Sequence, residues 1–117
     1  MSVISCGAMN TVKKSIKKRD QGVCPIAKTA DLVGDHWKLL IIRDLLTGKK
    51  RFGDLEQSLK GISSRTLTQK LEALVIDALV TRTEFNEKPP RVEYSLTPKG
   101  TDLLGIAEAM RRYGEKH

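Results

Sequence analysis

A chain of 117 residues supports one domain and buries only about two-thirds of its unfolded surface, so dimerisation would add useful apolar burial. The formal net charge of +7 favours a polyanionic partner such as DNA. Only 4% of the residues are aromatic, which argues against single-stranded nucleic acid, because stacked bases need aromatic platforms.

Residues 1–22 are predicted to form a basic N-terminal arm ahead of one domain over residues 23–117. The arm holds more than half of the excess charge in five cations: Lys13, Lys14, Lys17, Lys18 and Arg19. A short helix on the partner subunit and a disordered arm both remain open. Its apolar face is too narrow for a membrane surface. No secretory signal or bilayer-spanning run is visible, which predicts a cytoplasmic protein.

Cys24 precedes a predicted helix that starts at Pro25 and stops at Gly34. The dipole of that helix, with Lys28 nearby, favours a reactive thiolate. A redox-sensing thiol and a half-buried structural thiol both remain open, whereas Cys6 in the arm is interpreted as incidental. The two cysteines and two histidines lack metal-ligand spacing, so neither a metal nor a cofactor is expected.

A second helix is predicted from His36. It is apolar on most sides, which indicates a buried central element in which Trp37 packs rather than binds a ligand. A basic cluster follows Gly48, just before the next helix, and both phosphate contact and a solvated turn remain open. The cluster comprises Lys49, Lys50 and Arg51.

Two short helices follow, separated by Gly61 and Ile62. The first covers residues 52–59 and has a single apolar stripe, which predicts a supporting helix. The second begins at Ser63 or Ser64, whose hydroxyls can cap it, and its buried face comprises Leu67, Leu71, Leu74 and Val75. Its other side chains suit phosphates and base edges, although an ordinary solvated surface is the alternative. The predicted DNA contacts here are Ser63, Ser64, Arg65, Thr66, Thr68, Gln69 and Lys70.

Residues 80–85 and 92–96 are rich in β-branched and aromatic residues and are predicted to form a hairpin. Its loop contains Pro89 between Lys88 and Arg91, two cations that could straddle a phosphate backbone. Three acidic residues reduce the local charge: Glu84, Glu87 and Glu93. The hairpin is therefore predicted to position DNA rather than clamp it, and a purely structural hairpin remains open.

Thr97 and Pro98 mark the start of a last helix, as N-cap and first helical residue. We predict that its apolar stripe pairs with the same stripe of a second subunit, with packing onto its own subunit as the alternative. The predicted dimer-interface residues are Leu103, Ile106, Ala107, Met110 and Tyr113.

The order of helix, turn, helix, strand, wing and strand predicts a mostly α, α+β fold: a winged helix-turn-helix with a two-stranded wing and flanking dimerisation helices. Five segments in this order resemble the HxlR family of bacterial winged-helix transcription regulators, which are related to the MarR group. They are CPI at 24–26, GDHWKLLIIRDL at 34–45, RFGDL at 51–55, GISSRTL at 61–67 and PPRVEYSLT at 89–97.

The resemblance implies a homodimeric DNA-binding regulator without catalytic activity, whose N-terminal and C-terminal helices build the dimer interface. It also implies that Cys24 matches a cysteine that senses oxidants or electrophiles in several family members.

The sequence itself contains no Gly-rich phosphate loop, no nucleophile set and no paired carboxylates on an apolar wall, so an enzyme is not expected. The predicted function is a homodimeric transcription regulator of double-stranded DNA, responsive to oxidants or electrophiles through Cys24. The alternative is a winged-helix module for protein association without specific DNA binding.

Overall fold

The computed structural model describes residues 24–117, which fall into two units, one ending at Asp35 and one comprising residues 36–117. Within the first, helix α2 spans Pro25–Val33, with Pro25 in the first helical turn. Gly34 ends the helix, and a Cβ there would come within 2.5 Å of the Ala30 carbonyl oxygen. The predicted helix is therefore confirmed, whereas the predicted basic arm and Cys6 lie outside the described residues.

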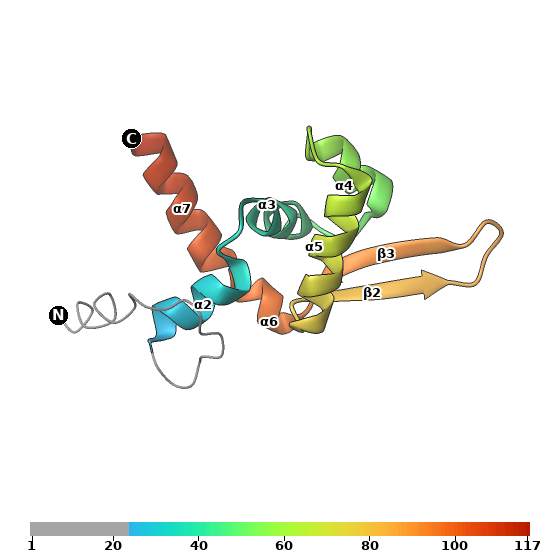
Figure 1. Cartoon of the computed structure of the whole chain (residues 1–117), viewed down its shortest axis with the longest axis horizontal. Helices are drawn as coiled ribbons and strands as arrows, with labels where there is room; N and C mark the ends of the chain where they lie inside the picture. Colours follow the sequence, from blue (N-terminus) through green and yellow to red (C-terminus); the bar gives the residue numbers. More distant parts are fainter. Residues whose placement is uncertain (1–23) are drawn as a thin grey trace. The chain divides into compact units, whose positions relative to one another are not determined.

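The second unit contains four longer helices, a short helical turn and three strands (Figure 1). In chain order they are α3 (His36–Leu45), β1 (Lys50–Arg51), α4 (Phe52–Ser58), α5 (Ser64–Ile76), β2 (Val80–Phe85), β3 (Arg91–Leu96), α6 (Pro98–Thr101) and α7 (Leu104–Lys116). Helices α4 and α5 form the helix-turn-helix, and β2 and β3 form the wing. The predicted winged helix-turn-helix fold is confirmed. No helix in the described part of the chain is long and apolar enough to cross a membrane.

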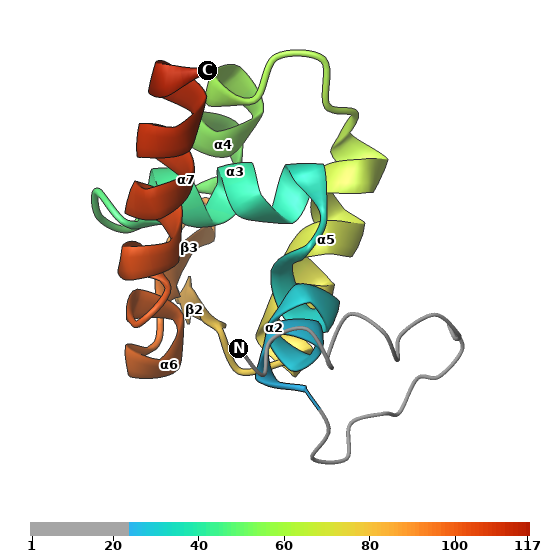
Figure 2. The same cartoon turned by 90° about the vertical axis from the view of Figure 1, so that its left-hand side faces the viewer.

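One face from each of α3, α4 and α5 builds the core of the second unit. Helix α3 lies across the space between α5 and α7 (Figure 2). The fully buried side chains are Ile41, Ile42, Leu55, Leu59, Leu67, Leu71, Leu74 and Leu79. In α5, Leu67, Leu71 and Leu74 stand four and three residues apart, and in α3 Ile41 and Ile42 stand four and three residues before the buried Leu45, so each helix presents one apolar face to the core.

Helix α3 is less buried than the sequence predicts. Ile41, Ile42 and Leu45 are buried, but Trp37 is only half-buried and packs edge-to-face on His36, with 4.8 Å between the ring centroids. The prediction of a helix covered on most sides is therefore wrong for the single subunit, because α4, α5 and β3 cover only part of its surface.

The sheet has three strands rather than the predicted two, in the order β1-β3-β2, and both pairings are antiparallel. In β1, Lys50 pairs with Tyr94 and Arg51 with Glu93. The basic cluster therefore contributes the third strand instead of forming only a turn. A strand of two residues is too short to carry a periodic pattern, so it arises from its pairing with β3.

The predicted C-terminal helix is divided into α6 and α7 by a break at Asp102 and Leu103. Its start is as predicted: the Thr97 hydroxyl oxygen accepts a hydrogen bond from the Gly100 N–H at 3.0 Å, and Pro98 is the first helical residue. Gly100 is buried, and a Cβ there would collide with the Leu79 carbonyl oxygen, so this position has no room for a side chain. This close approach fixes α6 against the residues that follow α5.

Candidate nucleic-acid interface

The N-terminus of α5 is held by side-chain hydrogen bonds. Ser63 is the N-cap, and its hydroxyl oxygen accepts a bond from the Thr66 N–H at 3.0 Å. The Ser63 and Thr66 hydroxyls also bond each other, and the Ser64 hydroxyl donates to Glu56 on α4. These three predicted DNA contacts thus have structural roles in the free chain. They orient the first turn of α5, whose remaining backbone N–H groups favour an approaching phosphate.

The outer face of α5 carries exposed polar side chains. Arg65, Thr68, Gln69 and Glu72 are exposed and stand three or four residues apart, so they lie on one face, opposite the buried leucines. Thr66 and Lys70, which were also predicted contacts, are half-buried. The exposed guanidinium, hydroxyl and amide groups are those that hydrogen-bond to base edges in a major groove.

The wing extends from the sheet on the side of the second unit away from α7 (Figure 1). Lys88 is exposed at its tip, as a phosphate contact requires. In β1, Arg51 is also exposed, and its backbone N–H donates to an Asp54 carboxylate oxygen at 3.0 Å at the start of α4. Lys50 is half-buried instead, and its ammonium donates to the Thr47 hydroxyl at 2.8 Å.

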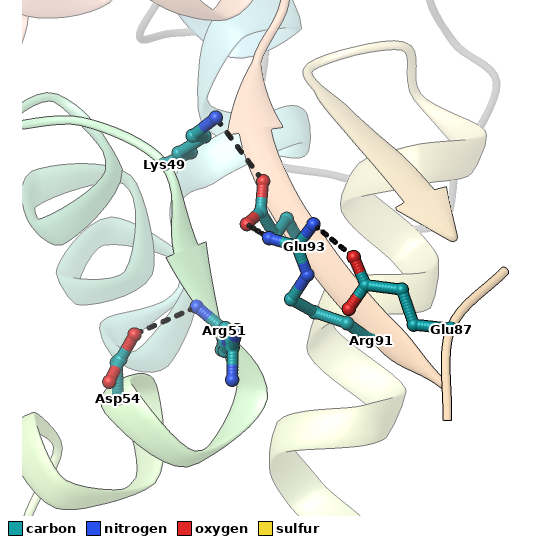
Figure 3. Close-up of polar contacts among 6 residues, drawn as sticks. All are labelled: Lys49, Arg51, Asp54, Glu87, Arg91 and Glu93. Atoms are coloured by element: carbon teal, nitrogen blue, oxygen red, sulfur yellow. Dashed lines mark hydrogen bonds and ion pairs between the residues drawn. The ribbon is translucent and has the colours of Figure 1, made fainter. Parts of the chain in front are cut away.

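The other two predicted phosphate contacts already have carboxylate partners (Figure 3). Arg91 makes ion pairs with Glu93 at 2.8 Å and Glu87 at 2.9 Å. Lys49 pairs with the second oxygen of Glu93 at 3.4 Å. The sequence interpretation treated these acidic residues only as a reduction of local charge. The Arg91–Glu93 pair could have been predicted from the sequence: side chains alternate along a strand, so these two residues, two positions apart, share one face of β3.

The opposite face of the sheet contributes to a pocket of about 410 Å³ beside α5. Its lining residues are Thr68, Leu71, Glu72, Val75, Ile76, Arg82 and Tyr94. A hydrogen bond with the Tyr94 phenol, and then the Glu84 carboxylate, raises the pKa of Arg82. This guanidinium therefore remains charged, and its interaction with Glu84 at 3.3 Å lies on the face away from Glu93.

Helix α7 has no buried residue. Met110 and Tyr113 are 51% and 69% exposed, and Leu104 and Ile106 are also exposed. Little of the predicted stripe packs against the rest of its own subunit. Packing within the subunit, the alternative considered from the sequence, therefore leaves these apolar side chains in water. Sequence reasoning did not include Leu104, which the break before α7 places at the first helical position.

Cys24 is the N-cap residue of α2, and its side chain makes no capping hydrogen bond. It is buried and disulfide-bonded. The predicted thiolate chemistry therefore applies to the reduced chain. In the described residues, no three His, Cys, Asp or Glu side chains are grouped so as to hold a metal ion.

Comparison with known proteins gives one consistent family. The profile of a family described as "HxlR-like helix-turn-helix" matches residues 32–117. The chain is 37% identical over 105 residues to an uncharacterised HTH-type transcriptional regulator, YybR of Bacillus subtilis, an alignment that covers 90% of this chain and 83% of YybR.

Two solved structures are similar to most of this chain. The redox regulator HypR in its oxidised form matches with a TM-score of 0.77 and 37% identity, covering 80% of this chain and 97% of HypR. The reduced form of the transcriptional regulator YodB from B. subtilis matches with a TM-score of 0.70 and 34% identity, covering 80% of this chain and 93% of YodB.

Proposed function

The chain belongs to the HxlR-like helix-turn-helix family of transcriptional regulators, and from that premise we propose that it binds a specific double-stranded DNA sequence as a homodimer. The observation that carries the proposal is the exposed face formed by Arg65, Thr68 and Gln69 on a well-capped α5. This helix would enter the major groove, while Lys88 on the wing and Arg51 before α4 would contact the flanking phosphates.

The exposed stripe of α7 supports the homodimeric part of the proposal. An isologous interface would cover the same apolar residues of both subunits, including Met110 and Tyr113. Two subunits related by a twofold axis would present their α5 helices to successive major grooves, about 34 Å apart, of an inverted repeat.

Salt titration of DNA binding tests the proposal. Arg51 and Lys88, the two proposed phosphate contacts, supply four cations in a dimer, which gives a log–log slope of the association constant against salt near −3.6. We expect this slope in fluorescence anisotropy with a fragment selected from genomic DNA. A slope near −9 would mean that Lys49, Arg91 or other paired cations leave their partners to bind phosphates. Absence of binding to any duplex at low salt would favour the alternative, a protein-association module.

A redox response through Cys24 is the second part of the proposal. It is supported by the disulfide at Cys24, by its position at the start of α2, and by the likeness to the redox regulator HypR. An adduct or disulfide there would change the position of α2 and, through the dimer, the spacing of the two α5 helices.

We expect diamide to change the operator affinity of the reduced wild-type protein by about 5- to 150-fold, the usual range of coupling between two sites. The Cys24→Ser variant should bind like the reduced protein and show no response. Cys6→Ser tests whether the response also needs the other of the two cysteines in the chain. Mass spectrometry would establish which cysteine is modified. Complete modification of Cys24 with unchanged operator affinity would assign the cysteine a structural role only.

A further inference from the structure

The face of the sheet that carries Glu93 holds a connected set of charged groups (Figure 3). The two oxygens of Glu93 have different partners: one pairs with Arg91 of the same strand and the other with Lys49. Arg91 in turn reaches Glu87 in the loop between β2 and β3. The set therefore connects the segment before α4, the middle of the sheet and the tip of the wing.

Arg91 is constrained on several sides. Its two terminal nitrogens contact different carboxylates, and its guanidinium carbon lies 4.0 Å from the centre of the Phe85 ring. Phe85 is also the cross-strand partner of Arg91. A planar guanidinium that is stacked on a ring and bonded at both ends has one orientation, so it fixes the groups it joins.

Burial makes the Arg91–Glu93 pair stronger than an ordinary surface pair, whereas Lys49 and Glu87 are themselves exposed. The side chains of Glu93 and Arg91 are only 12% and 25% exposed. A charge that has lost its water is costly without an oppositely charged partner. Exposed ion pairs contribute little to stability, because water screens them. The Arg82–Glu84 pair is of the exposed kind, since the Glu84 side chain is 65% exposed.

We propose that Glu93 is a positioning residue: through Arg91 and Lys49 it fixes the orientation of the wing relative to the start of the helix-turn-helix. We call the connected residues Lys49, Glu87, Arg91 and Glu93 the brace. Arg91 is then part of the brace and not a phosphate contact. The consequence for DNA rests on the proposed function, but the brace itself is a property of the free protein. The wing reaches its DNA-binding orientation before DNA arrives, which avoids an ordering cost on binding.

Replacing Glu93 by Gln distinguishes a positioning role from a simple electrostatic effect, because the two predict opposite changes in DNA affinity. An acidic side chain near a DNA-binding surface repels phosphates, so replacing it by an amide should strengthen binding. We expect Glu93→Gln instead to raise the dissociation constant for the operator about tenfold, which corresponds to a tenfold smaller population of correctly oriented wings. Glu84→Gln, on the opposite face of the same wing, is the matched control and should leave affinity unchanged or improve it.

A double-mutant cycle separates positioning from phosphate contact. If Arg91 acts through Glu93, Arg91→Gln should weaken binding in the wild-type background and have less than about a twofold effect in the Glu93→Gln background. The salt slope should stay the same in Arg91→Gln. A slope that falls by about 0.9 for each Arg91 in the dimer would identify a phosphate contact and overturn the positioning role.

Hydrogen exchange in the free protein tests the brace without DNA. We expect faster exchange at the wing-tip amides (residues 86–88 and 91) in both Glu93→Gln and Arg91→Gln, with the amides of α5 unchanged, because only the local restraint is lost. Unchanged wing-tip exchange in both variants overturns the proposal. Faster exchange in a protein that binds no duplex supports the brace and overturns the proposed function alone.

Discussion

Replacing Met110 by Asp is expected to convert the protein to a monomer and to weaken operator binding by about 100-fold or more. Met110 is 51% exposed in the centre of the apolar stripe of α7, so a partner subunit would bury it. A carboxylate in that position would have to lose its water without gaining a partner. Loss of the second subunit removes the avidity of two linked half-sites, which is typically 10²- to 10⁴-fold.

Light scattering at micromolar concentration and an operator titration measure the two effects of Met110→Asp together. Gly105→Asp is the matched control, because it adds the same charge to the same helix where nothing lies within 4 Å of the new Cβ. It should remain dimeric and bind normally. A dimeric Met110→Asp protein would place the subunit interface elsewhere.

Arg65→Ala is expected to weaken operator binding by about 1–3 kcal/mol and to leave non-specific binding nearly unchanged. Arg65 and Gln69 are exposed one turn apart on α5, so both would face the same bases. Competition assays with operator and unrelated DNA measure the difference. The control variant Arg112→Ala removes a guanidinium group from α7 and should change neither operator binding nor non-specific binding. Equal losses on both DNAs would make Arg65 a phosphate contact.

The helical part of the fold was predictable because its signals are local and repeated. Ser63 caps α5, Thr97 and Pro98 start α6, and Gly34 ends α2, each as its residue type indicates. The apolar spacing of α4 and α5 also identified the leucines of the buried faces, although Phe52 and Val75 are only half-buried. These features depend on neighbours within one or two turns, so one sequence contains all the information they require.

The features that were missed depend on residues far apart in the chain. Strand β1 exists because Lys50 and Arg51 meet Tyr94 and Glu93, and two residues have no pattern of their own. Separation along the chain also explains why the ion pairs at the candidate site were missed. In the sequence Lys49 and Arg91 look like free cations, and only the fold brings Glu93 between them. The sequence therefore shows which side chains are positively charged. Whether a cation is free to contact DNA depends on its ion pairs with residues far away in the chain.

The residues that follow α5 are joined to α6 by three hydrogen bonds. The Thr97 hydroxyl donates to the Ala78 carbonyl oxygen at 2.6 Å, the Thr97 N–H to that of Leu79 at 3.0 Å, and the Lys99 ammonium to that of Asp77 at 3.0 Å. Helix α5 and α6 therefore move together, and the break at Asp102 and Leu103 is the first place where the chain can bend before α7. In a dimer formed through α7, the angle at these two residues would set how many base pairs separate the half-sites. Relatives with the same reading helix but another geometry at this break would then recognise the same half-site at a different spacing.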